Sequence, residues 1–299
     1  MLATTTLRRP ELEGHVALVM VQLCFGLFPL FGKWAFTAFE PSAVAGWRVL
    51  AGAAAFFTLA LAVHGKRTWP AVADFPRLAA CALLGVALNQ VLYLHGLQRT
   101  TAVNAGLLMM LIPVFTFTIA VWARQERYVP RRGAGILIAF LGTTMLMLDK
   151  GPSVERGQMF GNLLIAANTL SYSLFLVLSR PLMRRYPPLV MIAWAYVLSL
   201  WTVPVLAHDA VWAPPAADRA AWLSLGLILL FPTILGYLFN LFALARVTAS
   251  TTAVYIFIQP LISGVAGVAW LGETVRSSTL VAASVIVLGL WLVTGLRRR

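Results

Sequence analysis

Hydrophobic residues run along most of the chain in long blocks, which short polar segments separate. Ten of these blocks approach the length of about 20 residues that an α-helix needs to cross the apolar core of a bilayer. They are His15–Phe36, Ser42–Val63, Phe75–Gln98, Thr101–Ala123, Gly133–Leu148, Gly161–Met183, Leu189–His208, Ala220–Leu244, Ala249–Leu271 and Ser278–Leu296. The pattern predicts an all-α polytopic membrane protein with ten transmembrane helices and one membrane domain.

Composition supports this interpretation and excludes an ordinary cytosolic enzyme. The 299 residues are 60% hydrophobic and 11% charged, with a mean hydropathy of +0.84. A soluble domain carries roughly a quarter of its residues as charged side chains. The sequence contains no HExxH pair, Gly-x-Ser-x-Gly elbow or P-loop, and its four histidines lack the spacing of metal ligands. We therefore expect no enzymatic activity, no cofactor and no metal site.

The net charge of +13 is at first suggestive of nucleic-acid binding. The basic residues are, however, dispersed over many short loops. If the N-terminus is cytoplasmic, most of the 23 Lys and Arg residues fall on the cytoplasmic side, as the positive-inside rule requires. We expect an inner-membrane protein with both termini in the cytoplasm, in contact with the lipid bilayer and not with nucleic acid.

A hidden repeat divides the chain into residues 1–149 and 150–299. A shift of 147 residues carries Pro113 onto Pro260 without a gap. The same shift aligns Gly14 with Gly161, Trp47 with Trp194, Arg99 with Arg246, Glu126 with Glu273 and Gly142 with Gly289. Each half holds five spans, an odd number, so the second half must enter the membrane in the opposite direction. Inverted repeats are typical of alternating-access transporters, whose substrate site lies near the midplane between the halves.

These residues also resemble a known family. The run of Arg99, Thr101, Ala102, Pro113, Glu126 and Gly142, with its twin from Arg246 to Gly289, is similar to the EamA domain. That domain occurs twice in ten-helix transporters of the drug/metabolite transporter superfamily. The resemblance implies a transporter, commonly an exporter of amino acids or other small metabolites. It also implies a central cavity lined mainly by the first, third, fourth, sixth, eighth and ninth spans.

Uncharged polar residues inside the spans are the candidates for substrate binding, because an amide or phenol in hydrocarbon needs a partner. They are Gln22, Asn89, Gln90, Tyr93, Asn104, Asn168, Tyr172, Tyr237, Asn240 and Gln259. Each could instead make an ordinary hydrogen bond between helices. As a group they predict an uncharged cavity for small neutral or zwitterionic metabolites.

Two prolines are the candidates for gating. Pro113 and Pro260 fall near the middle of their spans, where a proline removes one backbone donor and kinks the helix. Such a kink could act as a gate hinge or could be static.

Charged residues at the span ends are expected to be mainly structural. We assign Glu126 and Glu273 to helix-end packing, with a nearby base such as Arg127 or Arg276 as partner. Arg99 and Arg246 are expected to extend toward the membrane surface. A role for these four in opening the mouths is the alternative.

Lys33 and Arg48 could steer an anionic group or could also extend to the surface. All ten acidic residues lie outside the middle of the predicted membrane region, which argues against a proton carrier that uses a buried carboxylate. The favoured function is export of a small metabolite, and the rival is a channel-like or lipid-flipping protein.

Overall fold

The computed structural model describes residues 9–97, 99, 108–148, 159–206, 208–215, 217–259, 261–262, 265 and 277–294. Within these ranges the regular secondary structure is helical, without a strand. Five helical segments there are long and apolar enough to cross a membrane, namely Pro10–Gly32, Pro41–Thr68, Val72–Tyr93, Met159–Leu182 and Arg219–Leu244. Shorter apolar helices accompany them, so the predicted class of polytopic α-helical membrane protein is confirmed.

The first half of the chain contains, in order, α1 (Arg9–Gly26), α2 (Phe28–Ala35), α3 (Pro41–His64), η1 (Gly65–Thr68), η2 (Val72–Asp74), α4 (Phe75–Ala82), η3 (Leu83–Ala87), α5 (Leu88–Leu97), α7 (Ile112–Trp122) and α8 (Pro130–Leu148). The second half contains α9 (Met159–Leu182), α10 (Pro188–Val197), α11 (Thr202–Leu206), α12 (Arg219–Ile228), η5 (Leu229–Leu235), α13 (Gly236–Leu244), α14 (Ala249–Val254), η6 (Tyr255–Ile258) and α16 (Ser277–Thr294).

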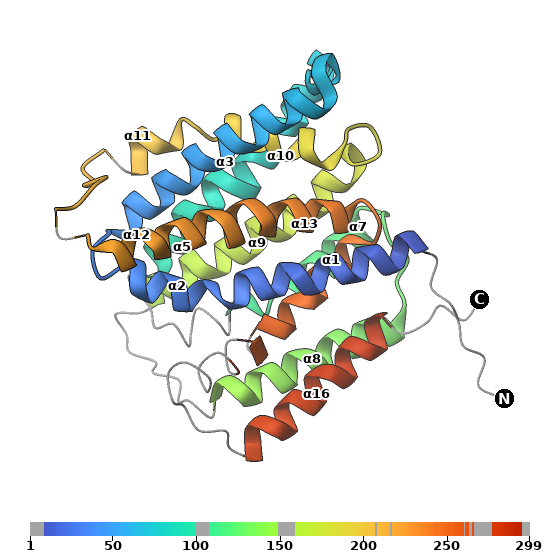
Figure 1. Cartoon of the computed structure of the whole chain (residues 1–299). Helices are drawn as coiled ribbons and strands as arrows, with labels where there is room; N and C mark the ends of the chain where they lie inside the picture. The colour runs from blue at the N-terminus through green and yellow to red at the C-terminus, as the bar shows by residue number, and fades with distance from the viewer. Residues whose placement is uncertain are drawn as a thin grey trace.

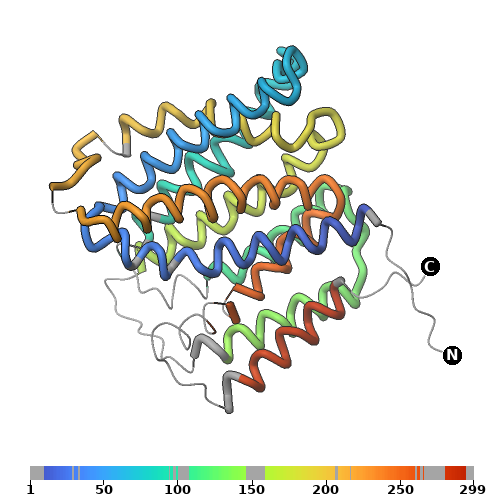
Figure 2. Tube along the Cα trace, in the orientation of Figure 1, coloured from blue at the N-terminus to red at the C-terminus, as the bar shows by residue number. Residues whose placement is uncertain are grey.

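The helices pair across the two halves in a pattern that the repeat shift preserves. Helix α1 packs on α13, and its repeat equivalent α9 packs on α5; α3 packs on α10, α7 on α14, and α8 on α16. The colours in Figures 1 and 2 show that α1 and α9 run in opposite directions. The start of α1 and the end of α16 lie at one end of the bundle, which we call the terminal face (Figure 1).

Two predicted spans are broken by turns at or near prolines. The first span is interrupted at Leu27, and α2 then begins with Pro29 in its first turn. The seventh span ends as α10 and resumes as α11, where Pro204 cannot donate a backbone hydrogen bond to the preceding turn. The chain bridges this break with tighter bonds, such as Ser199 N to Tyr196 O at 3.0 Å.

The third and eighth spans are each interrupted by a π-helical segment. Segment η3 lies between α4 and α5, and η5 lies between α12 and α13. The central residues of the two segments, Gly85 and Pro232, are separated by the same 147 residues as the rest of the repeat. Such turns recur at functional sites in helical proteins.

Helices α8 and α16 pack backbone to backbone at glycines. A methyl group added to Gly289 would lie 2.5 Å from Ala139 N, and one added to Gly142 would lie 3.0 Å from Ile286 N. These two contacts exchange under the repeat shift, because Gly142 corresponds to Gly289 and Ala139 to Ile286. Small residues allow this close approach between membrane helices.

Tryptophans fix a loop at each end of the bundle. Trp47 donates its indole N–H to Trp212 O at 3.1 Å, and its repeat equivalent Trp194 donates to Thr68 O at 2.7 Å. The indole of Trp47 also packs edge-on against Trp212, as that of Trp194 does against Trp69. The repeat thus extends to how the loops are anchored.

Candidate functional site

Segment η3 is the meeting point of side chains from the opposite half. Ser171 on α9 donates a hydrogen bond from Oγ to Leu84 O at 2.8 Å. Tyr237 on α13 directs its hydroxyl to Gly85 O at 3.4 Å. Within a bilayer, backbone carbonyls that leave the regular helical register need such internal partners. Two helices of the second half therefore bond to the π segment of the first.

Four predicted substrate residues hydrogen-bond close to this point. Asn168 donates from Nδ2 to Asn89 O at 2.7 Å, and Asn240 donates from Nδ2 to the Tyr172 hydroxyl at 2.8 Å. Asn168 and Asn240 are 1% and 3% exposed, so both amides are inside the protein. We call the following set the polar core: Asn89, Asn168, Ser171, Tyr172, Tyr237 and Asn240. It joins α5, α9 and α13 across the boundary between the halves.

Gln90 and Tyr93 lie beside the polar core on α5. Gln90 is only 6% exposed, and its amide nitrogen has no hydrogen-bond partner in the described part of the chain. A buried amide without a partner is uncommon in native proteins and calls for an explanation. Tyr93 is half-buried and follows Gln90 by three residues, so both lie on the same side of the helix.

A second group of polar contacts ties α1 to the ninth span. Gln259 donates from Nε2 to Oε1 of Gln22 at 2.9 Å, and Gln22 is 4% exposed. His15 Nδ1 lies 2.7 Å from the Tyr255 hydroxyl on the same pair of segments. Two predicted substrate residues thus meet each other here, outside the polar core.

Arg48 contacts the π segment of the second half. The sequence left two roles open for this residue, namely steering an anion or extending to the membrane surface. Its Nε donates to Oγ1 of Thr233 in η5 at 2.9 Å, and its guanidinium lies 5.2 Å from the centre of the Phe28 ring. Thr233 precedes Tyr237 by four residues, about one turn of the same span. The cavity was predicted to be uncharged, and Arg48 is a charged side chain whose bond to Thr233 lies one turn from Tyr237, one of the residues predicted to line it.

Glu126 is buried at the terminal face, with a side chain 3% exposed. Its carboxylate accepts a hydrogen bond from Arg132 at 3.0 Å and another from the backbone N–H of Ser250, in the first turn of α14, at 3.1 Å. A nearby base such as Arg127 was expected as the partner, and the base that α8 brings to the carboxylate is Arg132. Glu126 therefore connects the end of the fourth span to the start of the ninth.

The two equivalent arginines make different contacts. Arg246 pairs with Glu13 at 3.4 Å and stacks on the Phe242 ring. Arg99 is exposed and donates to His95 O at 3.0 Å. Both thus bond to the backbone or side chains at an end of a span, and a gating role for them stays a prediction.

Pro113 lies in the first turn of α7, after a turn at residues 110–111. The neighbouring Ile112 O accepts a hydrogen bond from Ser173 Oγ at 3.1 Å. The fourth span is therefore interrupted before Pro113, where a kinked but continuous helix was expected. Three predicted residues lie outside the described part of the chain, namely Asn104, Pro260 and Glu273.

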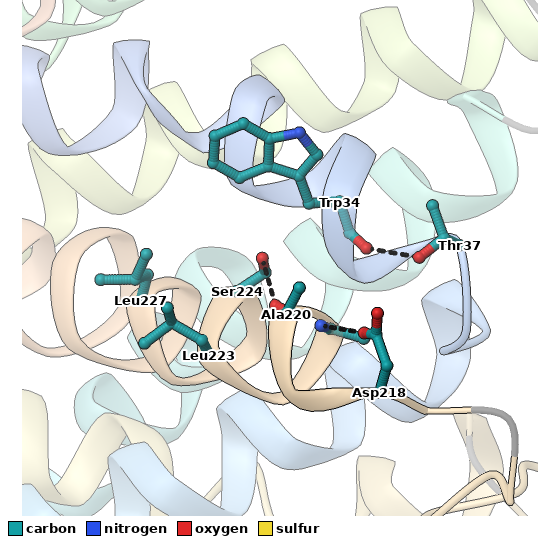
Figure 3. Close-up of a pocket in the computed structure, with 8 residues that line it drawn as sticks. Trp34, Thr37, Asp218, Ala220, Leu223, Ser224 and Leu227 are labelled. Atoms are coloured by element: carbon teal, nitrogen blue, oxygen red, sulfur yellow. Dashed lines mark hydrogen bonds between the residues drawn. The ribbon is translucent and has the colours of Figure 1, made fainter.

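Two surface hollows lie away from the polar core. The larger, about 440 Å³, lies between α2 and α12 with Trp34 and Ser224 in its lining (Figure 3). Ser224 donates to a carbonyl of its own helix, and Asp218 caps α12 through Ala221 N. The smaller, about 160 Å³, is lined mainly by apolar residues of α7 and α8. Neither hollow contains a predicted substrate residue.

A helical bundle built from two halves of opposite direction, with buried polar side chains between them, defines a polytopic membrane transporter. The chain belongs to the EamA-like transporter family, which matches residues 12–148 and again residues 159–295. This family and its curated relatives are transporters and not enzymes, so the chain acts on a small-molecule substrate in a membrane.

Relatives from bacteria and archaea are similar over most of the chain. A probable terminal-alkyne amino-acid exporter of Streptantibioticus cattleyicolor is 27% identical, covering 75% of this chain and 74% of its own length. The uncharacterized transporter YyaM of Bacillus subtilis is 22% identical over 95% of both chains. A solved crystal structure shares the fold, with a TM-score of 0.81, 20% identity and coverage of 97% of this chain and 98% of its own.

Proposed function

We propose that this transporter exports amino acids, or similarly small neutral or zwitterionic metabolites, by alternating access around the polar core. The observation that carries the proposal is the set of amides and phenols from α5, α9 and α13, buried where the two halves meet. Such groups offer both donors and acceptors without a net charge, which suits a zwitterion. The name of the Streptantibioticus cattleyicolor relative, an amino-acid exporter, points to the same substrate class.

The hydrogen bonds of the polar core also suggest how a substrate would act. The Asn240–Tyr172 bond joins α13 to α9, and the Asn168–Asn89 bond joins α9 to α5. A substrate that replaces these partners would exchange bonds of similar strength, at a net value of about 1 kcal/mol each. Of these two bonds, only the Asn168–Asn89 bond crosses between the halves, so its replacement would let them separate without leaving the Asn168 amide unsatisfied, whereas the Asn240–Tyr172 bond lies within the second half.

Uptake into liposomes that contain the purified protein tests this function. We expect saturable flux of at least one amino acid from a panel that also includes amphiphilic drugs. Asn240→Ala and Asn89→Ala should raise the half-saturation concentration, whereas Thr58→Ala, which removes an exposed hydroxyl bonded to its own helix, should not. Unchanged kinetics in both asparagine variants would move the site away from the polar core. Lipid scrambling without flux of any solute would favour the rival function.

The orientation is also part of the proposal. We infer that both termini lie in the cytoplasm and that the membrane is the inner membrane, because most basic residues then fall on the cytoplasmic side. The shared location of the start of α1 and the end of α16 supports termini on one side (Figure 1). A C-terminal alkaline phosphatase fusion should be inactive and a green fluorescent protein fusion bright. The reverse result would contradict this orientation.

We further propose that Pro113 and Pro260 serve as hinges of the fourth and ninth spans. The turn before Pro113 supports a hinge, because Leu111 N there bonds to Leu108 O, three residues back, in place of the usual four. Glu126, Glu273, Arg99 and Arg246 are proposed to hold the ends of these spans. Replacing Pro113 with Ala should slow flux while leaving substrate affinity in detergent unchanged. A normal rate in this variant would contradict the hinge.

A further inference from the structure

Arg48 lies well inside α3 and not at its end. It follows Pro41, the first residue of the helix, by seven positions, which corresponds to about 10 Å along the axis. Its Nε donates a hydrogen bond to Thr233 Oγ1, and the Thr233 hydroxyl in turn donates to Ile228 O at 2.9 Å. The Arg48 side chain is therefore held against the π segment η5 by a hydroxyl whose own proton is already engaged.

The outer end of the guanidinium remains available. Among the described residues, no carboxylate forms an ion pair with Arg48, and its two terminal nitrogens make no hydrogen bond. A charged group at this depth in a membrane protein is costly unless it has a partner. The Phe28 ring compensates only part of that cost through its contact with the cation.

Two phenols lie close to Arg48. The Tyr196 ring packs against Gly52, one turn along α3 from Arg48, and stands edge-on to the Tyr237 ring at 5.4 Å. The Tyr237 hydroxyl lies 3.4 Å from Gly85 O in η3, the segment that leads into α5. Gln90 lies one turn from Tyr93 on the same side of α5, with a buried amide nitrogen that has no partner in the described part of the chain. Two sets of unused N–H donors thus border the same group of phenols.

We propose that Arg48 and Gln90 form a carboxylate subsite of the transport site. This inference rests on the proposed function and narrows it, because it requires the substrate to carry a free carboxylate. The two terminal nitrogens of a guanidinium can bind both oxygens of a carboxylate at once. The Gln90 amide then supplies a further donor, and the polar core receives the rest of the substrate.

The subsite can be tested with related compounds that differ only in the carboxylate. For an amino acid that the wild-type protein transports, flux is compared with that of its amide and of the amine that lacks the carboxylate. Arg48→Gln should reduce flux of the acid at a subsaturating concentration about tenfold or more, as expected for a hydrogen-bonded ion pair. It should leave flux of the amide nearly unchanged. Arg67→Gln, which removes one exposed positive charge from η1, is the matched control and should retain the preference.

A second variant and a binding assay keep the test decisive if Arg48→Gln does not fold. In detergent, binding of a ligand raises the melting temperature of the protein. Gln90→Leu should reduce the rise caused by the amino acid severalfold and leave the rise caused by its amide unchanged. Equal losses for acid and amide in either variant would indicate a structural role and overturn the subsite. The subsite would also be overturned if phosphatidylglycerol, and not the amino acid, stabilised the protein in a way that depends on Arg48. The guanidinium would then bind lipid.

The outcome for the wild-type protein separates the two proposals. If it transports the acid and the amide equally well, the subsite is wrong while the proposed function stands. If it transports no amino acid at all, the proposed function itself fails.

Discussion

Removing the Glu126 carboxylate should destabilise the protein much more than removing another paired glutamate at the same end of the bundle. Glu126→Ala deletes the acceptor of two hydrogen bonds, one from Arg132 and one from the backbone of Ser250. Arg132 is 20% exposed and would lose its ion-pair partner in a largely dry environment. The first turn of α14 would also lose the acceptor of one of its N–H groups.

The magnitude follows from burial. Removing one member of a buried ion pair typically costs about 3–5 kcal/mol, since the other charge stays buried and unpaired. Glu13 provides the comparison, because it pairs with Arg246 at 3.4 Å while its side chain is 48% exposed. An exposed pair contributes about 0–1 kcal/mol. The two alanine variants should therefore differ by at least about 2 kcal/mol.

Reversible denaturant unfolding in bicelles measures both variants against the wild type. Glu126→Gln should fall between them, because the amide oxygen can still accept from the Ser250 N–H while the charge is lost. A double-mutant cycle with Arg132→Ala isolates the ion pair from the backbone contact. Equal stability of the Glu126→Ala and Glu13→Ala variants would refute the argument that burial sets the strength of this contact.

Further predictions concern packing and a buried indole. Gly85→Ala would place a methyl group 2.4 Å from the Phe175 ring and should lower stability by about 1–3 kcal/mol in the same assay. Gly226→Ala, with open space around the added methyl group, should be neutral or stabilising by up to about 1 kcal/mol; a loss equal to that of Gly85→Ala would contradict the packing argument. Trp194→Phe leaves the carbonyl of Thr68 without its 2.7 Å bond and should cost about 1–3 kcal/mol, which thermal unfolding would register. If Trp194→Phe lowers the melting temperature no more than a substitution at an exposed position does, then water replaces the indole as the partner of the Thr68 carbonyl.

The fold could be predicted from the sequence because its signals are long and repeated. Apolar length identifies spans regardless of their detailed packing, and rare residues such as Trp47 and Trp194 reveal the repeat even in a biased composition. An odd number of spans per half then fixes their opposite directions. The π segments could not be predicted, because an extra residue within a helical turn leaves the apolar pattern of Leu83–Ala87 unchanged.

The site was only partly predictable, because the residues that form its hydrogen bonds are far apart in the sequence. Sequence reasoning identifies which polar residues lie in the spans, but their partners are remote: Thr233 is 185 positions from Arg48, and Asn168 is 79 positions from Asn89. The depth of Arg48 within its span was the available signal for its proposed role. Glu126 shows the same limit, since a nearby base such as Arg127 was expected as its partner and the base that pairs with it is Arg132 of α8.

The glycine contact between α8 and α16 has a consequence for how such a molecule can be assembled. Because the contact of Gly142 with Ile286 exchanges with that of Gly289 with Ala139, the two surfaces are copies of one another, as in a symmetric dimer. A single five-span polypeptide inserted in both directions could form the same seam with itself. Residues 1–148 and 159–299, produced as separate chains in one cell, are expected to copurify, and Gly289→Leu should weaken their association.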